Sequence, residues 1–182
     1  VLSSCAGIWS YVLGDTVKLV ERDPPRLLVT GRTAYSLSAF GEHLIADEIE
    51  NSIAAAANSI GVTISDYSVG PIYPEKEGEL GGHLYIIEFL EPDIAKAQLE
   101  AFAETLDRQL SATNLDYETV RAEGFGLNPP KIRMVRSGMF ADWMKHRGKL
   151  GGQHKVPRII NDPAQFQELQ AFSNRFTRLT EV

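Results

Sequence analysis

Apolar residues recur at helical spacing in two stretches of this chain. Between residues 43 and 60, isoleucines and an alanine lie three or four positions apart, which places one apolar stripe on a helix that Gly61 ends. A second helix is predicted after Asp93, a candidate N-cap. Its buried face would consist of Ile94, Leu99, Phe102, Leu106 and Leu110.

Strand-like segments lie between and after these helices. Residues 62–67 and 83–89 are rich in β-branched and aromatic side chains and flank a charged turn at 75–79, so we predict a hairpin with a long loop. A short helical piece at 117–123 and a proline-containing breaker lead into another predicted strand at 131–135.

The order of these elements indicates the fold class. Helix, strand, strand, helix, strand becomes βαββαβ if Leu37-Ser38 or its neighbour supplies a first strand. That order predicts an α+β fold of the split-βαβ type, a sandwich in which helices pack on one face of a mixed sheet.

Further elements are predicted at both ends of this core. Residues 15–21 and 26–30 are strand candidates joined by a turn with two consecutive prolines, and we expect them to form a short β add-on. Residues 139–147 are predicted to be helical, and the glycine-rich run 148–152 ends that helix. A last helix is expected to begin near Asp162-Pro163.

Charge and residue usage exclude several classes of partner. Eighteen Lys and Arg against 24 Asp and Glu give a net charge of −6, so the chain lacks the basic excess that binds nucleic acid phosphates. Its apolar stretches fall far short of the roughly 18 residues of a membrane helix, and no signal peptide is predicted. We therefore expect a cytoplasmic protein that binds neither nucleic acid nor membrane. One cysteine and four scattered histidines show no metal-ligand spacing, so no metal site is expected.

The first candidate for chemistry is Asp15, which follows Gly14 and precedes Arg32 by seventeen residues. A carboxylate after a glycine turn can accept hydrogen bonds from both hydroxyls of a ribose, and an arginine on an adjacent strand can reach ribose or phosphate. Gly-Asp turns are common, so an ordinary turn is the competing interpretation.

The second candidate is Lys155. Glycines in the run 148–152 give the preceding backbone conformational freedom, and Val156-Pro157 stiffens the chain after it, so we expect Lys155 on a mobile loop anchored at one end. A long cation on such a loop suits an electrostatic clamp that closes on a phosphate. The competing interpretation is a hydrated basic surface loop, because five lysines and arginines cluster between residues 145 and 158.

Both candidates lie in blocks that resemble one family. The stretch Gly7-Ile8-Trp9-Ser10-Tyr11-Val12-Leu13-Gly14-Asp15-Thr16-Val17 resembles Gly-Leu-Tyr-Arg-Tyr-Arg-Leu-Gly-Asp-Val-Val of the auxin-responsive acyl-acid amido synthetases. The segment Gln153-His154-Lys155-Val156-Pro157-Arg158 is similar to their Gln-Tyr-Lys-(Thr/Val)-Pro-Arg ending. The blocks occur in the same order as in the family. Departures at Trp9, Ser10 and Val12 are what a distant, bacterial member would show, and His154 stands where plant members carry Tyr.

Looser similarity to the family covers nearly all of the chain between these blocks. It is carried by Leu37-Ser38 with Glu42, by Leu115-Asp116-Tyr117 with Arg121, and by Pro130-Lys131-Ile132 with Ser137-Gly138-Met139-Phe140.

The resemblance implies an adenylate-forming enzyme. Such an enzyme activates a carboxylic acid with ATP, releases pyrophosphate and transfers the acyl group to the nitrogen of an amino acid. On this interpretation residues 1–36 are the end of a large N-terminal adenylation domain, and residues 37–182 are the C-terminal lid domain. The chain also starts without methionine. We therefore expect a piece of a longer polypeptide that needs its large N-terminal domain and does not turn over alone.

The same resemblance implies roles for three residues. Asp15 would bind the ribose of ATP, Arg32 would bind ribose or phosphate, and Lys155 would approach the α-phosphate and the substrate carboxylate as the catalytic lysine. Mg²⁺ would arrive with ATP and be held mainly by phosphate oxygens, which needs few protein ligands. Gly31, Gly41 and the run 148–152 are candidate hinges of the lid.

Two other functions fit parts of the same pattern. An acyl-CoA ligase of the same superfamily would also use a Gly-Asp turn, a lid and a lysine, although the closing Gln-x-Lys-x-Pro-Arg block favours amide formation. A non-catalytic module that binds a ligand or a partner is the other alternative, because βαββαβ sandwiches carry many functions. The identities of the acyl acid and the amino acid are not encoded in this part of the sequence.

Overall fold

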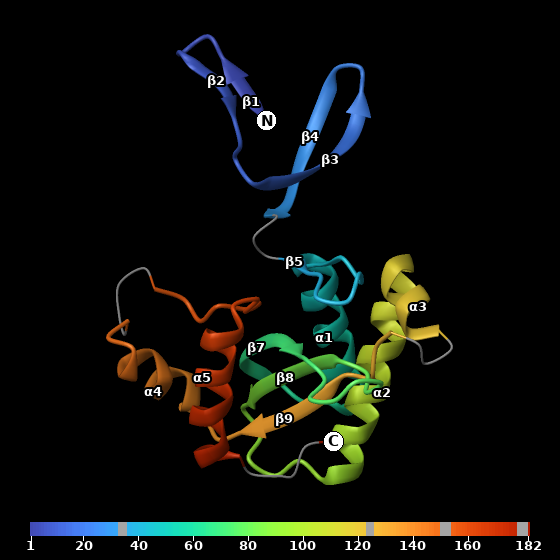
Figure 1. Cartoon of the computed structure of the whole chain (residues 1–182), viewed down its shortest axis with the longest axis vertical. Coiled ribbons are helices and arrows are strands. Elements are labelled where there is room, and N and C mark those ends of the chain that lie inside the picture. Colours follow the sequence, from blue (N-terminus) through green and yellow to red (C-terminus); the bar gives the residue numbers. More distant parts are fainter. Residues whose placement is uncertain (33–35, 123–125, 150–153, 178–181) are drawn as a thin grey trace.

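A computed structural model of the chain describes residues 1–32, 36–122, 126–149, 154–177 and 182. Two antiparallel hairpins come first, and in Figure 1 they stand apart from the body of helices and sheet that begins at Ser36. The hairpins are formed by strands β1 (Leu2–Ser4) with β2 (Ile8–Tyr11) and β3 (Asp15–Arg22) with β4 (Pro25–Arg32). The β3–β4 hairpin confirms the two predicted strands. The β1–β2 hairpin was not predicted.

A mixed three-stranded sheet forms the centre of the body. Strands β7 (Ile64–Ile72) and β8 (Gly82–Phe89) are antiparallel, whereas β8 and β9 (Lys131–Val135) are parallel. Strand β8 lies in the middle and is buried along its whole length. The predicted hairpin, the strand at 131–135 and the mixed α+β class are therefore confirmed.

Helices cover both faces of this sheet (Figure 1). Tyr85 and Ile87 of β8 share one core with α1 (Ala46–Ile60), α2 (Lys96–Thr113) and α3 (Leu115–Arg121). Leu84 and Ile86 share a second core with α4 (Met139–His146) and α5 (Pro163–Ser173). The prediction of helices on one face was wrong, because β8 alternates apolar side chains toward both faces and each set needs cover.

The segment expected to supply a first strand of the main sheet does not join it. Strand β5 (Ser36–Leu37) pairs instead with β6 (Leu44–Ile45) in a separate two-stranded ribbon. The outer edge of β7 is met by Ile159, which bridges Val69 in parallel. The long segment after α4 therefore reaches the outer edge of β7, and residues 37–38 lie outside the main sheet.

Two predicted helix starts shift by a few residues. The first helix starts at Ala46 and not near residue 43, because Leu44 and Ile45 are paired in the ribbon. Asp93 does not cap α2: Ala95 is the N-cap, and the Gln98 side chain accepts its backbone N–H at 3.1 Å.

Other predicted helix signals are confirmed. Gly61 ends α1 in the left-handed conformation with φ 70°, and the Asp162 side chain accepts hydrogen bonds from two backbone N–H groups of the first turn of α5. The predicted apolar face of α2 is buried at Ile94, Leu99, Phe102, Leu106 and Leu110.

Candidate functional site

Lys155 lies at a charged cleft on the body of the molecule. The lysine is exposed and lines a cavity of about 680 Å³. Helix α1, strand β7, helix α4 and the segment after α4 form its walls, and the charged or titratable side chains among them are Glu50, Asp66, Lys149, His154, Lys155 and Arg158. The three permanent cations that line this cavity favour an anionic ligand. The two carboxylates, Glu50 and Asp66, reduce the net positive charge of the lining.

Backbone hydrogen bonds fix the segment after Lys155 to the edge of β7. The N–H of Val69 donates to the carbonyl of Arg158 at 2.8 Å, and the N–H of Ile160 donates to the carbonyl of Val69 at 2.9 Å. The Ser68 hydroxyl adds a bond of 2.6 Å to the carbonyl of Pro157. The chain is thus held like a strand immediately downstream of Lys155, as expected for a loop anchored at one end.

Arg158 makes side-chain contacts with the same strand. Its Nη1 donates to Oδ1 of Asp66 at 2.6 Å, and its guanidinium carbon lies 4.4 Å from the centre of the Tyr67 ring. Burial raises the pKa of the Asp66 carboxyl above its ordinary range, although the charge of Arg158 opposes this shift. Burial raises the pKa of Tyr67 to about 12, so a neutral ring faces the guanidinium.

Asp15 and Arg32 face each other across the β3–β4 hairpin. Their Cα atoms are direct partners in the antiparallel register, so the strand pairing brings together the two residues expected at a nucleotide. Asp15 is half-buried, and the side chain of Arg32 lies outside the described part of the structure. Lys155 is not among these residues: the described residues that line its cleft all belong to the body.

Part of the glycine-rich loop cannot be compared with its prediction. Residues 150–153, which include two of the glycines and Gln153 of the closing block, lie outside the described residues. Gly148 is described and adopts φ 67°, and Gly41 adopts φ 93°. Both conformations favour glycine, but the hinge role of these residues and of Gly31 stays a prediction.

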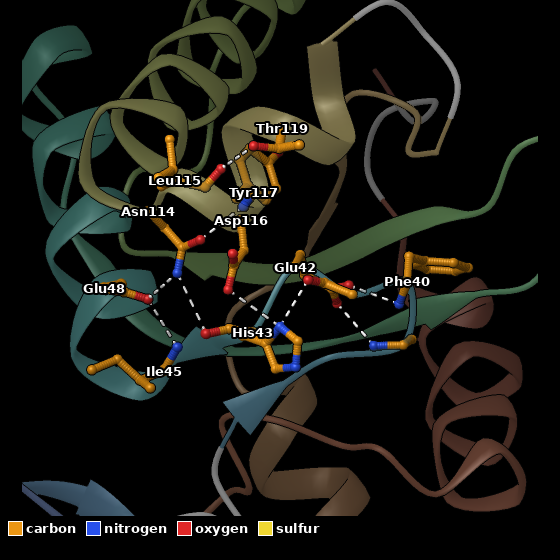
Figure 2. A network of polar contacts seen from close by, with 12 residues as sticks. Phe40, Glu42, His43, Ile45, Glu48, Asn114, Leu115, Asp116, Tyr117 and Thr119 are labelled. Carbon is orange, nitrogen blue, oxygen red and sulfur yellow. Dashed lines mark hydrogen bonds and ion pairs between the residues drawn. The ribbon is translucent and has the colours of Figure 1, made fainter.

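The segment that leads into α1 is tied to the body by a polar network that the sequence did not predict (Figure 2). Glu48 Oε2 accepts hydrogen bonds from the Ile45 N–H at 3.0 Å and from the Asn114 side chain at 2.9 Å. His43 lies next to Gly41 and Asp116, with Nδ1 at 2.8 Å from the Gly41 carbonyl and 3.3 Å from Oδ2 of Asp116. Side chains from α1 and from the α2–α3 junction therefore fix the entry into the body.

Glu42, in the same segment, forms a buried pair with His83 of β8. Oε1 of Glu42 lies 2.9 Å from Nε2 of His83, and both side chains are at most 1% exposed. The carboxylate also accepts the backbone N–H groups of Ala39 and Phe40. Burial raises the pKa of Glu42, but the hydrogen bond and charge of His83 and the backbone N–H groups outweigh it, so the pKa lies below its ordinary value.

Neither a metal cluster nor a membrane span is found in the described part of the chain. Within those ranges, no group of three or more histidine, cysteine or acidic residues is arranged to hold a metal ion. None of the described helices has the length and apolar character that a membrane crossing requires.

Comparison with known proteins agrees with this architecture. A family model described as the GH3 family C-terminal domain matches residues 47–164, which is more than half of the chain. The chain belongs to the GH3 family. The match covers the sheet, helices α1 to α4 and the segment that carries Lys155, so these belong to the C-terminal domain of GH3 proteins.

Solved structures show that the GH3 chain shares its fold with an acyl acid amido synthetase. The structure described as GH3.15 acyl acid amido synthetase has a TM-score of 0.74 at 18% identity, and AtGH3.15 acyl acid amido synthetase in complex with 2,4-DB has a TM-score of 0.71 at 18% identity. Each covers 98% of this chain, and this chain spans only 32% of each of them. A search of curated proteins finds no match.

Proposed function

We propose that this GH3 chain is the C-terminal part of an ATP-dependent acyl acid amido synthetase. The enzyme would adenylate a small carboxylic acid and transfer the acyl group to the nitrogen of an amino acid. The observation that carries the proposal is the placement of Lys155, an exposed lysine in a cationic cleft, immediately before a segment fixed to the sheet. A cytoplasmic location is part of the same proposal.

The N-terminal hairpins support the proposed division at residue 36. Isolated two-stranded hairpins are marginal in water, and large exposed apolar patches mark interfaces. Apolar side chains on these strands are nevertheless 42–82% exposed: Leu2, Ile8, Trp9, Tyr11, Val17, Leu19, Val20, Leu27, Leu28 and Val29. We therefore propose that residues 1–36 complete a large adenylation domain of the same polypeptide, and that residues 37–182 form its lid.

Each proposed site residue has a defined task in this reaction. Asp15 and Arg32, paired across their hairpin, would bind the ribose and phosphates of ATP. When a carboxylate oxygen attacks the α-phosphorus and pyrophosphate leaves, the ammonium group of Lys155 would neutralise the growing negative charge. Mg²⁺ would enter with ATP, with its ligands mainly phosphate oxygens. In the second step the amine nitrogen attacks the carbonyl carbon, loses its proton and displaces AMP.

Pyrophosphate release by the full-length enzyme tests the role of Lys155. Removing one preorganised hydrogen-bond donor that stabilises charge in the transition state typically lowers the rate about 10²–10³-fold, so we expect this loss in Lys155→Ala. Lys96→Ala, which removes an exposed cation from α2, is the matched control and should retain the parental rate. Equal pyrophosphate release by Lys155→Ala and the parent would remove Lys155 from the chemistry.

Product analysis separates amide formation from the alternatives. With ATP and a panel of carboxylic acids, we expect amino acids to give an amide product and coenzyme A to give none. A thioester product would favour an acyl-CoA ligase, and binding of an acid without pyrophosphate release would favour a non-catalytic module.

A further inference from the structure

A stiff link of two residues, Val156 and Pro157, places Lys155 three positions before the anchored Arg158. The ring of Pro157 fixes its own φ, and a residue before proline, here Val156, is restricted to extended conformations. Three residues span at most about 10 Å of extended chain. Any contact that orients Arg158 therefore limits where the lysine can point.

Strand β7 supplies two side chains that hold Arg158 from different sides. Asp66 accepts a charge-assisted hydrogen bond from Nη1, and the guanidinium carbon lies over the ring of Tyr67. Tyr67 is itself 5% exposed and belongs to the core with α1 and α2, so its ring cannot move freely. Asp66 is fixed in turn, because its Oδ1 accepts the backbone N–H of Tyr67 at 2.9 Å.

We propose that Asp66 and Tyr67 are positioning residues for Lys155, acting through Arg158. This inference rests on the proposed function and adds two residues that lie outside the family-like blocks of the sequence. The contact joins residues 92 positions apart, and it adds a side-chain anchor to the backbone hydrogen bonds that hold this end of the link. Through this link the anchor at Arg158 would position Lys155 at the cleft that it lines.

Kinetics of the full-length enzyme distinguish positioning from a general structural role. Misplacing a catalytic group by about 1 Å can cost about 100-fold in rate, so we expect Asp66→Ala, which removes the oxygen that accepts from Arg158, and Tyr67→Leu to lower kcat for pyrophosphate release at least 10-fold. KM for ATP should change less than about 2-fold, because the proposed nucleotide-binding residues are untouched. Tyr67→Phe keeps the ring and should retain the parental kcat.

A matched control exists in the same domain. Arg136 pairs with Asp142 and lies 4.3 Å above the ring of Phe176, which repeats the arrangement of carboxylate, guanidinium and aromatic ring without a link to Lys155. Asp142→Ala, which removes the carboxylate from this arrangement, should leave kcat unchanged. In a Lys155→Ala background, Asp66→Ala should cause no further loss, since residues that act through one group are not additive.

Hydrogen exchange of this chain tests the anchor without any catalytic assay. In Asp66→Ala we expect the N–H of Ile160, which bonds to β7, to exchange at least 5-fold faster than in the parent, whereas Asp142→Ala should not affect it. If exchange and kcat are both unchanged in Asp66→Ala while Lys155→Ala loses activity, the positioning inference is overturned and the proposed function stands. Full additivity of the Asp66 and Lys155 substitutions in the double variant would also overturn the positioning inference. If Lys155→Ala retains parental pyrophosphate release, the proposed function fails and the inference fails with it.

Discussion

Glu42→Gln tests whether one buried carboxylate stabilises the segment that leads into α1. Oε1 of Glu42 accepts hydrogen bonds from the Ala39 N–H at 3.0 Å and from Nε2 of His83 at 2.9 Å, and Oε2 accepts the Phe40 N–H at 2.7 Å. A glutamine has the same shape but only one acceptor oxygen. Whichever way its amide turns, an NH₂ group faces at least one of these donors.

The contacts set the size of the effect. One hydrogen bond to a charged group contributes about 1.5–3 kcal/mol, and a buried donor left unsatisfied costs about 1–3 kcal/mol. Glu42 is fully buried, so solvent does not replace the lost bond. We therefore expect Glu42→Gln to lower the free energy of unfolding by about 3 kcal/mol near neutral pH, within the range seen when buried pairs are broken.

The same substitution predicts a dependence on pH. The folded-state pKa of Glu42 lies below its ordinary value of 4.5. A lowered pKa contributes stability that is fully present above the ordinary value and is lost as pH falls through the folded-state pKa. The difference in stability between parent and variant should therefore shrink as the pH falls below 4.5.

Urea unfolding followed by circular dichroism measures both quantities. Unfolding curves for the parent and Glu42→Gln are compared near neutral pH and at acidic pH, with Glu77→Gln in the exposed 75–79 loop as the control that should match the parent. A difference below about 1 kcal/mol near neutral pH, or one that does not change on acidification, would refute this account of the pair.

Three further predictions concern packing, a second polar network and exposure. Gly70→Ala should lower stability by about 1–3 kcal/mol in thermal or urea unfolding, because its Cβ would lie 2.6 Å from the Phe166 ring, and an unchanged midpoint would contradict the close packing. Tyr117→Phe should lower the free energy of unfolding by about 1.5–3 kcal/mol, because it removes the 2.7 Å hydrogen bond from the hydroxyl to Asp107. The pKa of Asp107 should rise as that bond is lost. Iodide should quench the fluorescence of Trp9, which is 82% exposed, and leave the emission of the other, buried tryptophan of this chain unaffected; equal quenching of both would contradict the described exposure.

The sequence by itself determined the local elements and the blocks that carry the proposed chemistry. The stripe of α1, its end at Gly61 and the N-cap Asp162 depend on neighbours within one or two turns, so they can be predicted without tertiary contacts. Lys155 and Asp15 stood out in the same way, because each lies in a short contiguous block that resembles the family.

Only the tertiary structure decided which distant residues meet. Any of 24 acidic residues could have partnered Arg158, and the register of its segment against β7 selected Asp66. The pair of Glu42 and His83 depends likewise on β8 passing beneath the segment before α1. Helices on both faces of the sheet were missed for a related reason. A fully buried strand and a half-buried strand differ in what packs on them, and that packing comes from segments far away in the chain.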